Sequence, residues 1–163
     1  MSNPQVFLDL SIDGGDSQRV TIELFTNVVP KTCENFQALC NGFDDKLNYK
    51  GTEFHRLVSG GWLEGGKLPN VGEGEARSIF GESFPDESFS VCFDEPGILA
   101  MTNSGAHSNG SQFFITLAAH EWLNTKSVAF GKVVEGFDTL KSITSGPSEI
   151  PDQKVTVVGC GSL

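Results

Sequence analysis

The sequence predicts a mainly β fold, built as an antiparallel barrel or a sandwich. Two runs of alternating apolar residues flank a glycine-rich turn, several short strand-like runs follow, and two segments have helical spacing. The strand-like runs do not alternate with helices, which argues against a parallel doubly wound sheet. The pattern does not choose between barrel and sandwich. The length of 163 residues favours a single domain over residues 1–163.

The chain begins with a predicted β-hairpin. "VFLDLSI" and "RVTIELF" are separated by a turn that contains "DGG". Every second residue of both runs is apolar, so one face of each strand is expected to be buried. These apolar residues are Val6, Leu8, Leu10, Ile12, Val20, Ile22 and Leu24.

Two helices are predicted, the first of them in "VVPKTCENFQALCNG". Pro30 suits its first turn, and Asn41-Gly42 is a typical stop. Its apolar residues fall at helical spacing and predict a buried face made of Cys33, Phe36, Leu39 and Cys40. The shorter second helix is expected in "GFDTLKSI", where Phe137, Leu140 and Ile143 align.

The remaining strands are expected in five short runs rich in β-branched and aromatic residues. The runs cover residues 53–58, 97–101, 112–117, 127–134 and 154–160. Between them, the glycine-rich span 65–81 has neither strand nor helix periodicity and is interpreted as a long surface loop.

Charge and cysteine content limit the possible partners and location. The net charge of −10 and the pI of about 4.6 argue against nucleic-acid and membrane partners. The cysteines lie at 33, 40, 92 and 160, without metal-ligand spacing, and are interpreted as four buried free thiols in a reducing compartment. No secretory signal or membrane span is visible, so a cytoplasmic location is expected. A monomer without metal or cofactor is expected.

The stretch "SGGWLEGGK" has the glycine spacing of a phosphate-binding loop, since Gly61 and Gly66-Lys67 follow G-x-x-x-x-G-K. Such a loop needs Ser or Thr next and must lead into a helix. Here the next residues are Leu68 and Pro69, and no helical pattern follows. The spacing is therefore interpreted as chance, and a nucleotide site is not expected.

Polar residues within apolar runs are the candidates for a binding site. Arg56 lies in "EFHRLV", Gln112 and Phe114 share one face of "SQFFIT", and Trp122 lies in "HEWLN". They could form an apolar pocket with a hydrogen-bonding wall, although spacing does not show that they meet. Hydrolase chemistry is disfavoured because no G-x-S-x-G occurs and Cys33 falls on the buried helix face.

The chain resembles the cyclophilins, which are peptidyl-prolyl cis–trans isomerases. The matching pieces run over nearly the whole chain, and "PKTCENF", "FHR" and "NGSQFFIT" are the most specific of them. The resemblance implies a closed eight-stranded antiparallel β-barrel capped by two α-helices. It also implies rotation of Xaa–Pro bonds in peptides and proteins, as an aid to protein folding.

The resemblance assigns three residues to catalysis. Arg56 would act on the prolyl amide, Gln112 would bond the substrate backbone, and Phe114 would lie under the proline ring. It also places nine residues in substrate binding: Gly61, Trp62, Glu64, Thr102, Asn103, Ser104, Trp122, Leu123 and Ser127. His55 adjoins Arg56 but should face the other way in a strand, so a structural role is expected for it.

Four positions depart from the family pattern. Gly61 replaces a pocket phenylalanine, Trp62 a methionine, Glu64 a glutamine that supports the arginine, and Ser127 a histidine. Trp62 could refill the opened pocket or narrow it, and Glu64 is expected to pair with Arg56. The resemblance therefore implies an attenuated isomerase, with a weakly catalytic or non-catalytic binding module of a larger assembly as the alternative. Cyclosporin binding is expected in weakened form.

Overall fold

A computed structural model describes residues 3–58, 60–69, 71–72, 74–143 and 154–163. Eight strands form one sheet in the order β3-β4-β6-β5-β7-β2-β1-β8, and every pairing is antiparallel. The strands are β1 (Gln5–Ile12), β2 (Ser17–Leu24), β3 (Arg56–Val58), β4 (Trp62–Gly65), β5 (Ile98–Met101), β6 (Phe113–Thr116), β7 (Ala129–Glu135) and β8 (Val155–Ser162). The mainly β prediction is confirmed.

The sheet curves into a half-barrel, and the expected closed barrel is wrong in this respect. The strand ladder ends at β3 on one side and at β8 on the other. Residues 51–54, which precede β3, approach β8 through the single bridge between Glu53 and Thr156. Backbone hydrogen bonds from Gly51 to Val157 and from Phe54 to Val155 support this approach. These contacts bring the edges together without extending the ladder.

The first hairpin has the predicted faces. Val6 lies opposite Ile22 and Leu8 opposite Val20, so alternate side chains of β1 and β2 point to the same side. Of the seven apolar residues, six are fully buried, and Ile12 is half-buried at the strand end. Burial of each such side chain stabilises the fold by roughly 1.5–3 kcal/mol, which fixes the register.

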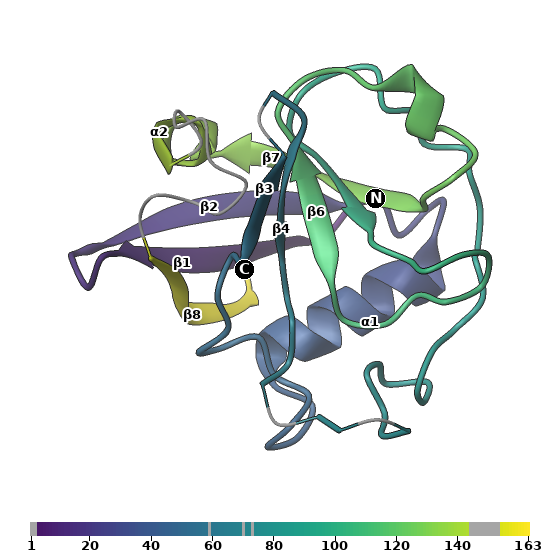
Figure 1. Cartoon of the computed structure of the whole chain (residues 1–163), viewed down its shortest axis with the longest axis horizontal. Coiled ribbons are helices and arrows are strands. Elements are labelled where there is room, and N and C mark those ends of the chain that lie inside the picture. The colour runs from purple at the N-terminus through teal and green to yellow at the C-terminus, as the bar shows by residue number, and fades with distance from the viewer. Residues whose placement is uncertain (1–2, 59, 70, 73, 144–153) are drawn as a thin grey trace.

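Two α-helices pack on the sheet, α1 (Pro30–Asn41) and α2 (Phe137–Ile143), and lie on opposite sides of it in the view of Figure 1. The predicted buried face of α1 is confirmed, and Gly42 ends the helix with a φ of 83°. The carboxylate of Glu87 accepts hydrogen bonds from the backbone N–H groups of Lys31 and Thr32. It thereby satisfies donors that the helix leaves unpaired at its N-terminus.

An aromatic cluster joins α1 to the sheet. The ring of Phe36 lies 5.2 Å from Tyr49, 5.0 Å from Phe113 and 4.9 Å from Phe130, measured between centroids. All four residues are buried. Because Phe113 and Phe114 are adjacent on β6, their side chains leave opposite faces of the strand. The cluster therefore lies directly behind the face on which Phe114 stands.

Two short elements were not predicted from the sequence. Strand β4 directly precedes the span 65–81 that was interpreted as a loop and overlaps it only at Gly65, and a 3-10 helix covers Glu121–Leu123. The free thiols also differ from the prediction in one case. Cys33 and Cys40 are buried and Cys160 is half-buried, but Cys92 is exposed, so the interpretation of four buried thiols is wrong for Cys92.

Candidate functional site

The register of three strands places the candidate residues in one row. In the β3–β4 hairpin Arg56 lies opposite Glu64, and in the β4–β6 pair Glu64 lies opposite Phe114. Directly opposed residues of an antiparallel pair project from the same face of the sheet. Residues 56, 64 and 114, which are far apart in sequence, therefore stand beside one another.

Glu64 is held between two donors. Arg56 Nη1 donates to Glu64 Oε2 at 3.4 Å, and Trp62 Nε1 donates to Glu64 Oε1 at 3.3 Å. The predicted ion pair with Arg56 is confirmed. The Glu64 side chain is 13% exposed whereas the Arg56 side chain is 54% exposed, so the arginine remains open to solvent. A single long contact of this kind contributes about 0–1 kcal/mol, and it leaves most guanidinium donors free.

A small aromatic pocket lies beside this row. It has a volume of about 150 Å³. Eight residues line it, and the sequence had assigned all eight to the site: Trp62, Glu64, Thr102, Asn103, Phe114, Trp122, Leu123 and Ser127. The structure therefore brings these residues together, from β4, the segment after β5, β6 and the segment 121–127.

Trp62 lines this pocket and lies close to two of its other aromatic side chains. Its indole centroid lies 5.5 Å from that of Phe114 and 6.0 Å from that of Trp122. Phe114 is buried and stacks on Phe93 at 6.0 Å with an interplanar angle of 11°. Trp122 is 57% exposed and stands at the rim. Trp62 thus occupies part of the pocket and narrows what remains.

Gly61 is not among the residues that line this pocket, and its assignment to substrate contact stays a prediction. It is buried, and a Cβ atom there would lie 3.0 Å from Val58 Cγ1. Its carbonyl accepts a hydrogen bond from Leu117 N and lies 3.0 Å from His120 Nε2. Gly61 is thus closely packed at the position directly before Trp62.

His120 is a residue of the site's surroundings that the sequence did not reveal. Its ring packs edge-on against Trp62 at 5.8 Å and against Trp122 at 6.5 Å. With its contact to the Gly61 carbonyl, it fixes the two indoles relative to each other. Only its position two residues before Trp122 could have drawn attention to it. His55, in contrast, lines neither pocket.

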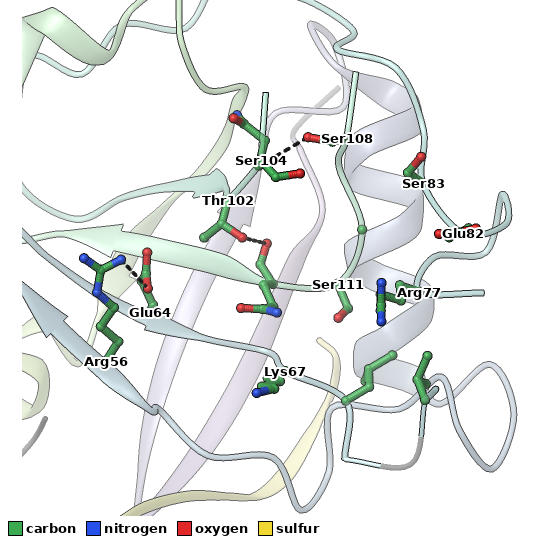
Figure 2. A pocket seen from close by; sticks show the side chains of 15 residues that line it. Arg56, Glu64, Lys67, Arg77, Glu82, Ser83, Thr102, Ser104, Ser108 and Ser111 are labelled. Atoms are coloured by element: carbon green, nitrogen blue, oxygen red, sulfur yellow. Dashed lines mark hydrogen bonds and ion pairs between the residues drawn. The ribbon is translucent and has the colours of Figure 1, made fainter. Parts of the chain in front are cut away.

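A second, larger pocket of about 530 Å³ adjoins the aromatic one and shares Glu64, Thr102 and Asn103 with it. Arg56, Ser104 and Gln112 also line it (Figure 2). The backbone carbonyl of Gln112 accepts bonds from Thr102 N at 3.1 Å and Thr102 Oγ1 at 3.3 Å. Its side-chain amide has no partner within the described residues.

The backbone of Asn103 is free to pair with a ligand. Within the described residues, neither its N–H nor its carbonyl has a hydrogen-bond partner. Its side chain is fixed instead, since Nδ2 donates to Lys126 O at 2.9 Å and Oδ1 accepts from Gly105 N at 3.3 Å. An extended peptide could therefore pair with the main chain here, in the manner of an added strand.

The glycine spacing of "SGGWLEGGK" has a structural cause unrelated to phosphate. Residues 62–65 form β4 rather than a loop that leads into a helix. A Cβ atom at Gly65 would lie 2.7 Å from the ring of Phe54, and one at Gly66 would lie 2.6 Å from the Ser111 carbonyl. The glycines permit this close packing, which agrees with the rejection of a nucleotide site.

Three further observations concern the Cys33 thiol, metal ligands and helix hydropathy in the part of the chain that the structure describes. Burial raises the pKa of the Cys33 thiol to about 12, so it is not a nucleophile at neutral pH. No group of three or more His, Cys, Asp or Glu side chains is arranged to hold a metal ion. None of the described helices has the length and hydropathy to cross a bilayer.

Fold and site together define a cyclophilin-like domain, with an arginine beside a small aromatic pocket. The sequence model of the cyclophilin-type peptidyl-prolyl cis-trans isomerase/CLD family matches residues 7–162. The chain belongs to the cyclophilin family. It is 46% identical over 167 residues to the Bos taurus protein named "Probable inactive peptidyl-prolyl cis-trans isomerase-like 6". The match covers 97% of this chain and 54% of that relative, so the chain spans about half the relative's length.

Proposed function

We propose that this domain catalyses cis–trans isomerisation of Xaa–Pro bonds at a reduced rate. The observation that supports it most is the state of Arg56, which is 54% exposed and held by one contact of 3.4 Å. It lines the larger pocket and stands in register with Glu64 and Phe114. Its guanidinium is thus positioned by the sheet and still available to a substrate.

The reaction requires no nucleophile and no cofactor. Amide resonance creates a barrier of about 18–20 kcal/mol to rotation of the peptide bond. In the twisted transition state the prolyl nitrogen regains its lone pair, and a guanidinium N–H can donate to it. Such a donor, already oriented before the substrate binds, stabilises the transition state more than the planar ground state. Phe114 would hold the proline ring, and the Gln112 amide and the Asn103 backbone would hold the chain.

Two contacts support a reduced rate. Glu64 takes one of the Arg56 donors that the transition state would use. Trp62 packs on Phe114 and leaves a pocket of only about 150 Å³ for the proline ring. The first contact lowers the stabilisation that Arg56 provides, and the second lowers affinity for bulky proline segments.

Glu64→Gln is expected to raise the isomerisation rate about two- to fivefold, the range that follows from removing a weak exposed ion pair. The amide has a single acceptor oxygen, so it can replace only one of the two carboxylate oxygens that now accept from Arg56 and Trp62, and it no longer holds the guanidinium as a charge. NMR exchange spectroscopy on an Ala-Pro peptide measures the isomerisation rates of wild type and variant. Equal rates would contradict this role of Glu64.

The alternative function is a proline-peptide-binding module with little or no turnover, serving in a larger assembly. The filling of the pocket by Trp62 favours it, and so does the name of the relative, which describes that protein as probably inactive. NMR titration with a proline peptide distinguishes the two functions. Cis–trans exchange that accelerates on addition of the protein supports the enzyme, whereas chemical-shift changes without exchange support the module.

Cyclosporin is proposed as a weak ligand of the same groove, and proline-containing peptides and proteins as the natural partners. Trp122 at the rim is accessible, but Trp62 narrows the pocket and Ser127 offers a smaller wall than histidine. A saturating concentration of the drug should raise the thermal midpoint by binding the native state. The thermal midpoint with and without drug measures this effect, and an unchanged midpoint would contradict it.

A monomeric state and a cytoplasmic location remain predictions, and the four free cysteines support the cytoplasmic location.

A further inference from the structure

The larger pocket is unexpectedly basic for this chain. Three basic side chains line it, Arg56, Lys67 and Arg77, against two acidic ones, Glu64 and Glu82. This local excess of positive charge occurs in a chain whose net charge is −10. A basic concavity on an acidic surface attracts a single anionic group while the rest of the chain repels a polyanion.

The two basic residues beyond Arg56 have no acidic partner in the part of the chain that the structure describes. No ion pair within 4.0 Å involves Lys67 or Arg77 there. Glu64 is already engaged by Arg56 and Trp62. In Figure 2, Arg56 and Arg77 lie at opposite ends of the pocket with Lys67 below and between them, and Glu82 lies on the far side of Arg77.

Arg77 is also positioned by its surroundings. Its backbone N–H donates to the Gly81 carbonyl at 3.1 Å. A Cβ atom added at Gly110 would lie 3.3 Å from Arg77 Cβ, so the stem of the arginine packs closely on that glycine. Arg77 is half-buried rather than fully exposed. Less of its rotamer freedom is therefore lost when it binds an anion.

Serine hydroxyls complete an anion-binding lining. Ser83, Ser104, Ser108 and Ser111 all line the pocket. Ser111 donates to the Gly66 carbonyl and Ser108 to the Gly105 carbonyl. The hydroxyls of Ser83 and Ser104 have no partner among the described residues, so both are available as donors. Carboxylate and phosphate oxygens accept hydrogen bonds from such hydroxyls and from guanidinium groups.

We propose that this pocket selects proline peptides that carry an acidic or phosphorylated side chain two residues from the proline. The inference rests on the proposed binding of the proline in the adjoining aromatic pocket. In an extended peptide, residues i and i+2 project to the same side. A proline in the smaller pocket therefore directs the side chain two positions away into the larger one. The volume of about 530 Å³ accommodates a side chain of this size.

The test compares peptides that differ only in the residue two positions before or two positions after a single proline. Glu, phosphoserine, Gln and Lys are placed there in turn, and affinity is measured by NMR titration at low and at high salt. At one of the two positions, the Glu peptide should bind about five- to tenfold more tightly than the Gln peptide. Phosphoserine should bind at least as tightly as Glu, and Lys most weakly. High salt should reduce these differences.

Arg77→Gln and Lys67→Gln should each reduce the preference for Glu over Gln, measured as the ratio of the two peptide affinities within the same variant. Lys31→Gln is the matched control, because Lys31 is exposed on α1 and lines neither pocket. Equal affinities for Glu and Gln peptides at both positions would overturn the proposed preference for an anionic side chain, while the proposed binding of proline peptides would stand. A preference that survives in both variants would overturn its assignment to this pocket. If no peptide binds at all, both this inference and the proposed function fail.

Discussion

Replacing Arg56 with alanine is expected to reduce the isomerisation rate about 100-fold, the usual effect of removing one transition-state donor. Arg56 lies in one row with Glu64 and Phe114, and only one of its guanidinium N–H groups contacts Glu64. The other guanidinium donors are available to a substrate. Peptide affinity should fall much less, because the aromatic pocket and the Asn103 backbone are untouched. NMR exchange spectroscopy gives the rate, and a titration of the same peptide gives the affinity.

Arg19→Ala provides the matched control for this variant. Arg19 is also a half-exposed arginine in an ion pair, with 50% of its side chain exposed and a 2.9 Å contact to Asp9. It lies on β2, away from both pockets, so its loss removes the same charge without touching the site. The control should isomerise at the wild-type rate. If Arg56→Ala also retains the wild-type rate, Arg56 is not the catalytic group and the proposed mechanism is wrong.

The fold was predictable wherever burial leaves a periodic pattern in the sequence. The hairpin β1–β2 and helix α1 each bury one face, so their apolar residues alternate or recur at helical spacing. β4 was missed because it is only four residues long and lies between glycines, so it has too few residues to show a period. The open ladder was missed because the closed barrel was implied by resemblance alone, and no local pattern encodes whether the edge strands β3 and β8 pair.

The site could be predicted only in part, and the reason is register. The sequence named all eight residues of the aromatic pocket through resemblance, but spacing alone does not bring Arg56 and Phe114 together. Their proximity comes from two strand pairings. The β3–β4 pairing places Arg56 opposite Glu64, and the β4–β6 pairing places Glu64 opposite Phe114. The direction of Trp62 depends in turn on packing against His120 and Trp122, which only three-dimensional contacts determine.

Replacing Phe36 with alanine is expected to lower the free energy of unfolding by about 3–5 kcal/mol. Phe36 is fully buried, and its ring contacts Tyr49, Phe113 and Phe130, so its removal leaves a cavity between α1 and the sheet. For a domain of this size, the thermal midpoint should fall by about 10 °C. Chemical denaturation and a thermal scan measure both quantities. Phe43→Ala is the control, because Phe43 is 57% exposed and its loss should change stability by less than about 0.5 kcal/mol.

The same variant separates stability from function. Phe36 contacts Phe113 on the core face of β6, whereas Phe114 faces the pocket from the other side of that strand. Register in β6 is held by its pairing with β4 and β5, which the substitution leaves in place. Well below its midpoint, Phe36→Ala should therefore bind proline peptides with nearly the wild-type affinity. Loss of binding by the folded variant would show that core packing, and not backbone pairing alone, sets the position of Phe114.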